Sequence, residues 1–238
     1  MKIKFVILSV VIVILSSCKD EKKDGKLKLT TDTTIQDSIN VKNSININDI
    51  QCFDNDTLQF QDSKISVYNE FKIRGKGVLS IAITDKVTIL NEDNTFFGEI
   101  ILKEESDYEI NLPTKIVARS FVPAFDDFSF DAEEPSDNNE YLKIYINKAL
   151  KKISKKQVEY SFDKWDDYLK KSLINIRNCN EAKDNNTYKI IKIEDNLIKI
   201  QSISKKQCDG IENYKPVSKE IKWKNSQDVL LVNFYSCN

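Results

Sequence analysis

The stretch YKIIKIEDNLIKIQSI, residues 188–203, contains two apolar runs separated by a short acidic turn. Tyr188 to Ile193 and Leu197 to Ile203 are rich in the β-branched and aromatic residues that strands favour. Glu194-Asp195-Asn196 lies between them, and Asp and Asn stabilise turns by bonding nearby backbone groups. The stretch therefore predicts a β-hairpin.

The C-terminal segment predicts a second hairpin. Glu220 to Trp223 and Val229 to Tyr235 are strand-like, and the polar residues 224–228 lie between them. We therefore expect residues 179–238 to form one small β-rich unit.

The segment before this unit has a helical pattern. Five apolar residues fall on one stripe at helical spacing: Trp165, Tyr168, Leu169, Leu173 and Ile176. Asp163 is suited to cap such a helix. We predict one amphipathic helix within residues 161–178, running from Asp163 to about Arg177, with Trp165 in the core.

Residues 51–160 predict a first β-rich unit. From about Leu58 the apolar residues recur with a period of two. Residues 86–90 and 96–102 flank the turn-forming segment 91–94 and predict a hairpin. Gly75 and Gly77 indicate a bulge or tight bend. The fold class that follows is mainly β (α+β), with two small antiparallel β-rich units joined by one amphipathic helix.

Residues 121–140 combine aromatic and acidic side chains. Phe121, Phe125, Phe128 and Phe130 alternate with acidic residues that include Asp126, Asp127 and Asp131. Clustered carboxylates suit an acidic binding loop or a calcium site, although the EF-hand spacing is absent. The favoured interpretation is a long surface loop whose phenylalanines enter the core and whose acids face water.

The next segment predicts a further hairpin. Tyr141 to Ile146 alternates well, and Asn147-Lys148 suits a turn into Ala149 to Ile153. Residues 148–156 carry five lysines, which we interpret as a solvated edge that resists aggregation.

The N-terminus carries an export pattern. Lys2 and Lys4 precede eleven mostly apolar residues, 5–15, which are too few for the ~20 of a spanning helix and fit the apolar part of a signal peptide. Small residues at 16 and 17 then precede Cys18. This order resembles a bacterial lipoprotein signal with its lipobox. The resemblance implies that residues 1–17 are a signal peptide and that Cys18 carries lipid, including palmitate-type acylation. Several acyl chains would anchor the protein stably.

Residues 18–50 are predicted to be a lipidated N-terminus and a disordered tether, because they are polar and lack aromatics. The residues directly after Cys18, Lys19-Asp20-Glu21, resemble the export signal of Bacteroidetes surface lipoproteins. The expected location is the outer membrane, lipid-anchored, and either periplasmic or surface-exposed.

Charge and cysteine content restrict the function further. Without residues 1–17 the chain has 34 basic and 37 acidic residues, a net charge near −3 that does not favour nucleic acid. Four cysteines remain beside Cys18, and an even number in an oxidising compartment suggests disulfides: Cys52, Cys179, Cys208 and Cys237. We favour Cys179 paired with Cys208 or Cys237. The sequence contains no His, which excludes a Cys/His zinc site, and no cysteine pair has the CxxC spacing that would favour a four-Cys site. We predict no metal site and no cofactor.

The strand rhythm, with Tyr188 to Ile193 and Ile221-Lys222-Trp223-Lys224 before the last strand, resembles Src-homology-3-like small β-barrels of the bacterial cell envelope. The resemblance implies binding of peptides or glycans through an aromatic groove. The candidate residues for that groove are Tyr188, Tyr214, Trp223 and Tyr235, of which Trp223 also suits core packing.

Three functions follow as hypotheses. The first is a non-enzymatic lipoprotein of the cell envelope that binds a protein or glycan. The second is an immunity or inhibitor lipoprotein, in which Asp126, Asp127 and Asp131 of the acidic loop would block the basic active site of a toxin or envelope enzyme. The third is a hydrolase. Without His it would need a carboxylate pair rather than a Ser-His-Asp triad, and we rank it last.

Overall fold

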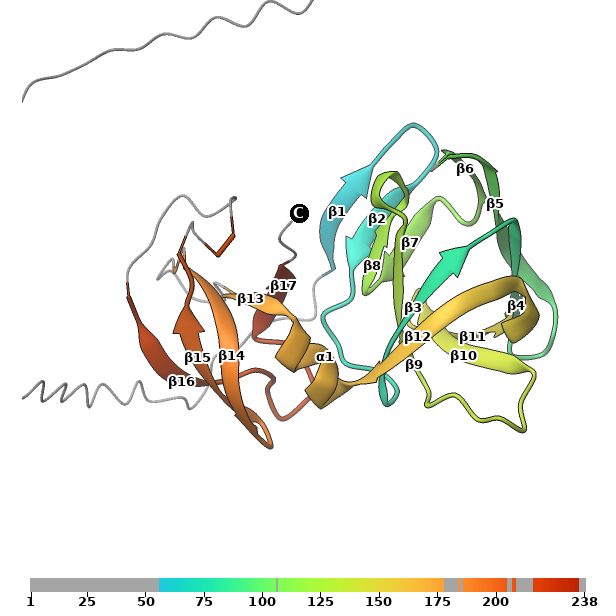
Figure 1. Ribbon diagram of the computed structural model, residues 1–238. Coiled ribbons are helices and arrows are strands. Elements are labelled where there is room, and N and C mark those ends of the chain that lie inside the picture. Colours follow the sequence, from blue (N-terminus) through green and yellow to red (C-terminus); the bar gives the residue numbers. More distant parts are fainter. Residues whose placement is uncertain are drawn as a thin grey trace, which may run out of the picture. The chain divides into compact units, whose positions relative to one another are not determined.

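Strands dominate the computed structural model, which describes residues 56–105, 107–177, 184, 186–204, 207, 208 and 216–235. These residues fall within one compact unit and form seventeen strands, one α-helix and two short 3₁₀ helices (Figure 1). The prediction of a mainly β (α+β) class with several antiparallel sheets is therefore confirmed.

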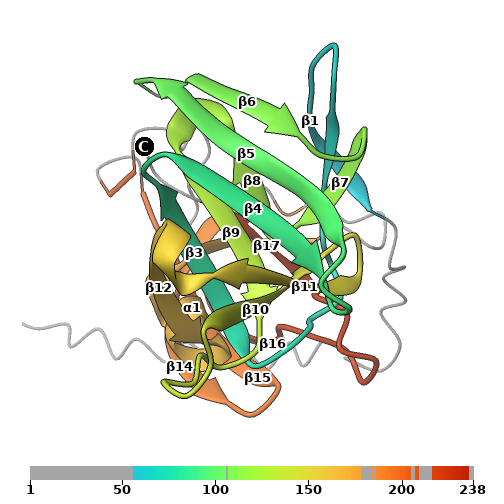
Figure 2. The same cartoon turned by 90° about the vertical axis from the view of Figure 1, so that its right-hand side faces the viewer.

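The largest sheet has nine strands, in the order β12-β3-β9-β10-β11-β4-β5-β6, with β8 paired to β9. Its members are β3 (Gly77–Ile83), β4 (Lys86–Asn91), β5 (Phe96–Glu104), β6 (Asp107–Asn111), β8 (Ser120–Val122), β9 (Asp127–Ala132), β10 (Tyr141–Ile146), β11 (Ala149–Ser154) and β12 (Val158–Lys164). All of its pairings are antiparallel. Figure 2 shows β4, β5 and β6 side by side, and β4–β5 is the hairpin predicted at 86–102.

A second sheet, of three strands, shares its apolar core with the large sheet. It consists of β1 (Thr57–Gln61), β2 (Ser66–Asn69) and β7 (Lys115–Ala118), in that order, and β2 runs parallel to β7. Asn147, in the turn after β10, accepts a hydrogen bond from the Val117 N–H and donates one to the Lys115 carbonyl. One apolar core, which includes Val67, Leu79 and Phe130, therefore serves both sheets.

The C-terminal sheet has five strands, in the order β16-β15-β14-β13-β17. They are β13 (Leu173–Ile176), β14 (Thr187–Glu194), β15 (Leu197–Ser202), β16 (Ser218–Lys222) and β17 (Val232–Tyr235). The hairpin predicted at 188–203 is present as β14–β15. The hairpin predicted at 220–235 is wrong, because β16 pairs with β15 whereas β17 pairs with β13. The Lys224–Leu230 bridge, together with the Leu231 N–H to Trp223 carbonyl and Asn225 N–H to Val229 carbonyl bonds, joins the two ends of this sheet, so it curls nearly closed.

The helix is shorter than the pattern predicted. Helix α1 spans Trp165–Lys171, and its N-cap is Lys164 rather than Asp163, which ends up within β12. Leu173 and Ile176 instead lie in β13, where pairing with β14 and β17 satisfies the backbone on both sides. Two acids in the first turn and two lysines in the last complement the helix dipole.

One segment of the N-terminal half completes the core of the C-terminal sheet. Phe71 is buried among Leu169, Tyr188 and Trp223, and its carbonyl accepts a hydrogen bond from the Leu230 N–H. The Ile73 N–H donates to the Asp228 carbonyl. The segment at Phe71 and Ile73 therefore crosses from the predicted first unit, 51–160, into the core of the C-terminal sheet.

Residues 121–140 are not the predicted surface loop. Strand β9 occupies Asp127–Ala132 and lies inside the large sheet, paired with β3, β8 and β10. Before it, the 3₁₀ helix η1 spans Pro123–Phe125. The phenylalanines at 121, 128 and 130 enter the core as predicted. The expectation that all the acids face water is wrong for Asp131, because Arg119 on a neighbouring segment neutralises it in the interior.

The predicted Asn147-Lys148 turn is present, with positive φ at both residues. The lysine-rich strand after it is not an edge, because β11 lies between β10 and β4. Lys151 is buried there, with its ammonium over the Phe97 ring. The short 3₁₀ helix η2, Lys155–Gln157, leads from β11 into β12.

Candidate functional site

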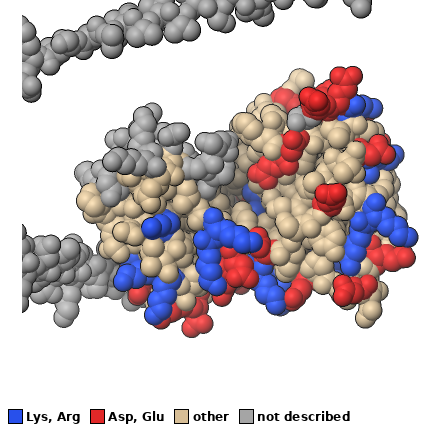
Figure 3. All heavy atoms as spheres, in the orientation of Figure 1, with Lys and Arg blue, Asp and Glu red and all other residues tan. Residues whose placement is uncertain are grey.

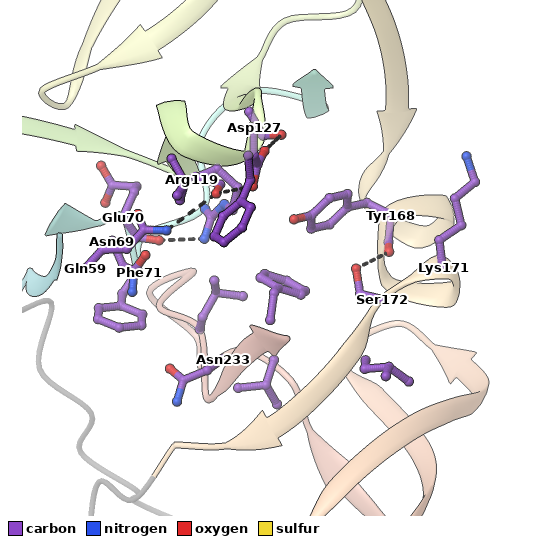
Figure 4. A pocket seen from close by; sticks show the side chains of 18 residues that line it. Gln59, Asn69, Glu70, Phe71, Arg119, Asp127, Tyr168, Lys171, Ser172 and Asn233 are labelled. Carbon is purple, nitrogen blue, oxygen red and sulfur yellow. Dashed lines mark hydrogen bonds between the residues drawn. The ribbon is translucent and has the colours of Figure 1, made fainter. Parts of the chain in front are cut away.

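A cleft of about 850 Å³ lies where the large sheet meets the C-terminal sheet. One wall comes from β1, β8 and β9, and the opposite wall comes from α1, β13 and β17 (Figure 4). This volume is within the usual range for small-ligand sites, which are often formed between packed units.

A buried ion pair lies at the base of the cleft. Arg119 donates from Nε and Nη2 to the two oxygens of Asp131, at 2.8 and 2.9 Å, and from Nη1 to the Glu70 carbonyl. The two paired side chains are 3% and 1% exposed. Arg119 also lies over the rings of Trp165 and Phe234, 5.1 and 5.7 Å from their centroids. It thus joins the two halves of the fold.

A second ion pair supports the first. The Glu70 carboxylate accepts a hydrogen bond from Arg74 Nε at 3.1 Å and one from the Lys72 backbone N–H. The Arg74 N–H donates in turn to Asp131. Burial raises the pKa of Glu70, and the hydrogen bond from Arg74 opposes that rise. Each buried carboxylate therefore has an arginine beside it.

Asp127 is held in the cleft by hydroxyl groups. Its carboxylate accepts hydrogen bonds from Ser120 at 2.5 Å and from Ser129 at 3.0 Å. Gln59 donates from Nε2 to the Ser120 hydroxyl at 3.5 Å. The Gln59 Oε1 atom is buried and has no hydrogen-bond partner among the described residues. The wall from β1, β8 and β9 thus presents a carboxylate and an unsatisfied amide oxygen.

The opposite wall is aromatic. The Tyr168 ring meets the Phe234 ring edge to face, with centroids 4.9 Å apart. The Tyr168 hydroxyl points across the cavity toward the side that holds Arg119 and Asp127 (Figure 4). Burial is the main reason that the pKa of Tyr168 is raised to about 12. At neutral pH this phenol is therefore a neutral donor aimed into the cleft.

The rim of the cleft carries an exposed phenylalanine. Phe125 is 70% exposed, at the end of η1. Asp126 follows it with φ 52°, in the left-handed region. The chain thus turns sharply between Phe125 at the rim and Asp127 inside the cleft.

Two of the four residues of the predicted aromatic groove are described, and both are buried. Trp223 is buried and donates from Nε1 to the Asp195 carbonyl, as expected of a core residue. Tyr188 is fully buried, and its hydroxyl donates to Asp184. Tyr214 and the side chain of Tyr235 lie outside the described residues.

The three acidic candidates lie in three different environments. Asp127 lines the cleft. Asp131 is buried beneath it, paired with Arg119, and Asp126 is exposed and accepts a hydrogen bond from the Tyr108 hydroxyl at 2.6 Å. They therefore do not share one acidic surface, and the immunity function stays a hypothesis.

The cysteine predictions fall mostly outside the described residues. This applies to Cys18, Cys52, Cys179 and Cys237, and to the proposed signal peptide and tether at 1–50. Cys208 is described and is buried beside Ile203 and Leu173. Its pairing with another cysteine stays a prediction.

The surface electrostatics are balanced on the face in Figure 3, where basic and acidic side chains are interspersed. Among the described residues, no cluster of three or more His, Cys, Asp or Glu side chains could hold a metal ion. None of the helices in that part of the chain has the length and apolar character needed to cross a bilayer.

No protein-family model, curated protein or solved structure matches this chain. The candidate site is therefore defined by its own geometry. It combines an aromatic wall, amide and hydroxyl groups, and one carboxylate, which is a set suited to hydrogen bonding and ring stacking with a polar ligand.

Proposed function

We propose that this protein is a lipid-anchored, non-enzymatic binding module of the bacterial cell envelope, and that the cleft binds its protein or glycan ligand. The observation that carries the proposal is the unsatisfied polar lining of the cleft. Gln59 Oε1 has no partner among the described residues, and the Tyr168 hydroxyl points into the same cavity. A buried polar atom without a partner costs free energy, so a ligand that supplies the missing bond would bind favourably.

The C-terminal sheet supports the resemblance to Src-homology-3-like barrels. Strands β13 to β16 form a meander, and β17 returns to pair with β13, which nearly closes a small five-stranded barrel. The proposed site nevertheless differs from the groove expected from that resemblance, because residues of β1, β8 and β9 line one of its walls.

The anchor at Cys18 rests on the signal and lipobox pattern. We propose that the mature chain is held at the outer membrane by lipid on this residue. In a cell fractionation, the wild-type chain should appear in the membrane fraction and the Cys18→Ser variant in the soluble fraction. An unchanged membrane association of the variant would contradict the lipid anchor.

The binding role is tested by capture on the full chain, solubilised in detergent. Immobilised wild-type protein is exposed to defined cell-wall glycan fragments and, separately, to envelope proteins. Asn233→Trp places a large ring in the cleft from an exposed position on β17. Gln201→Trp is the matched control, since it replaces an exposed amide on β15 that does not line the cleft.

We expect capture of one ligand class by the wild type and by Gln201→Trp, and its loss in Asn233→Trp. Retention of ligand by Asn233→Trp would show that the cleft is not the binding site. Capture of neither class would contradict the binding function.

A further inference from the structure

We propose that the cleft recognises a primary ammonium group of its ligand, with Asp127 as the carboxylate that pairs with it. This inference rests on the proposed binding function and deepens it, because it specifies the charge of the ligand. A lysine side chain and an amino sugar both carry this group, and the experiment below distinguishes them.

The first step is the charge balance of the cleft. Arg119 pairs with Asp131, and Arg74 pairs with Glu70, so these two pairs cancel. Asp127 is left as a carboxylate bound only by the hydroxyls of Ser120 and Ser129, without an ion-pair partner among the described residues. The cavity therefore carries one uncompensated negative charge.

The second step concerns the remaining cation of the lining. Lys171 forms its ion pair with Asp163, on β12. Figure 4 shows its side chain directed away from the cavity. Lys171 therefore leaves the Asp127 carboxylate available to a ligand.

The third step is the surroundings of the carboxylate. A carboxylate has about four lone-pair positions, and the serine hydroxyls use two of them. Tyr168 faces Asp127 across the cavity, Phe234 packs against the Tyr168 ring and also lines the cavity, and Phe125 is exposed at the rim. The Tyr168 hydroxyl oxygen can accept a hydrogen bond from an ammonium group, so this phenol and the Asp127 carboxylate favour the same kind of ligand group.

A negatively charged ligand group is disfavoured in the cleft. Three of the five N–H donors of Arg119 are already used by Asp131 and the Glu70 carbonyl, and its side chain is almost completely buried. An anionic ligand would also meet the Asp127 carboxylate. The geometry therefore selects a cation over a phosphate or carboxylate.

The test uses two pairs of probes, and in each pair acetylation of the amine removes the positive charge and adds a small acetyl group. Nα-acetyl-lysine methylamide is compared with its Nε-acetylated form, and glucosamine is compared with N-acetylglucosamine. Binding to the full chain is followed by amide NMR shifts and calorimetry. We expect the charged member of at least one pair to bind at least about tenfold more tightly, as a charge-assisted hydrogen bond implies. Preference in the lysine pair alone indicates a protein ligand, and preference in the sugar pair alone indicates a glycan.

Two variants test whether Asp127 and Tyr168 cause the preference for charged probes. Asp127→Asn keeps the shape and removes the charge, so the preference for charged probes should disappear. Asp126→Asn is the matched control, because it changes the neighbouring carboxylate outside the cleft and should keep the preference. Tyr168→Phe provides a second variant that keeps the ring and should weaken binding of the charged probes.

Equal binding of charged and neutral probes would overturn the inference, and so would a preference that survives in Asp127→Asn. If both kinds bind equally and Asn233→Trp abolishes both, the ammonium specificity fails while the binding function stands. If no probe binds at millimolar concentration, the inference fails, and the separate capture experiment decides the binding function.

Discussion

Arg119 and Asp131 form a bidentate ion pair in the interior, with N–O distances of 2.8 and 2.9 Å, between a large β-sheet and a smaller one. The same guanidinium lies over Trp165 of α1 and Phe234 of β17. The pair thus fixes the base of the cleft and its aromatic wall together.

Asp131→Asn should destabilise the fold strongly. It leaves the Arg119 charge buried without compensation, and breaking such a pair typically costs about 3–5 kcal/mol. Urea unfolding followed by tryptophan fluorescence measures the change. Asp167→Asn is the control, since its pair with Lys170 is 57% exposed on the Asp side and should contribute less than about 1 kcal/mol. Equal effects of the two substitutions would contradict a structural role for the buried pair.

Phe71→Ala should loosen the C-terminal sheet although residue 71 lies far from it in sequence. Phe71 is buried in the core of that sheet, and removal of a buried phenylalanine ring typically costs about 3–5 kcal/mol. Hydrogen exchange should show faster amide exchange in β14 and β15 than in β3. Phe96→Ala, at a 60% exposed ring, should change stability by at most about 0.5 kcal/mol.

Alkaline pH should destabilise the protein through tyrosines that are partly or largely removed from water. Burial raises the pKa of Tyr108, Tyr145 and Tyr168 to about 12, whereas tyrosine in an unfolded chain titrates near pH ~10. The folded state therefore holds the phenolic protons more tightly. The resulting stabilisation is fully present below pH ~10 and is lost as the pH rises toward 12.

Ultraviolet absorbance at high pH and urea midpoints at increasing pH measure this effect. Tyr168→Phe should remove one of the late-ionising groups and reduce the alkaline loss of stability. Complete ionisation of all tyrosines below pH ~11 in the folded protein would contradict the prediction.

Cys208 should be recovered in a disulfide. It is buried, and three further cysteines are available in a compartment that we propose is oxidising. Peptide mapping under non-reducing conditions should recover Cys208 linked to Cys179, Cys237 or Cys52. Recovery of Cys208 only as an alkylated thiol would contradict the disulfide framework.

Local patterns predicted local structure well in this chain. The hairpin at 188–203 depends on two adjacent runs and the turn between them, so the sequence contains all of its determinants. The helix was predicted too long because Leu173 and Ile176 continue the helical stripe. In the fold these residues belong to β13, whose partners β14 and β17 lie later in the chain.

Strand β9 is an element that the local sequence pattern did not predict. Phe128, Phe130 and Ala132 alternate along it as strand residues should, but the acids beside them suggested a surface loop. The charged Asp131 carboxylate can be buried because Arg119 forms an ion pair with it. That contact joins Asp131 on β9 to Arg119, which lies between β7 and β8, and nothing near Asp131 in the sequence indicates it.

The cleft itself could be predicted only in part. Asp127 was among the candidates, whereas Tyr168 was interpreted only as part of a core stripe and Gln59 gave no signal. These three residues come from β1, β9 and α1, and only the packing of the two sheets brings them together. The alternation of Phe128 and Phe130 was the one sequence signal that could have placed Asp127 on a strand.

The pairing of β17 with β13 has a consequence for how the chain reaches its native state. The C-terminal sheet needs Phe71, made early in synthesis, and residues 232–235, made much later. Contacts that join such distant segments close slowly, because loop-closure entropy must be overcome first. We therefore expect the large sheet to fold first during refolding, with Phe71, which follows β2, left exposed until β17 pairs with β13. The cleft would then be the last part of the native structure to form.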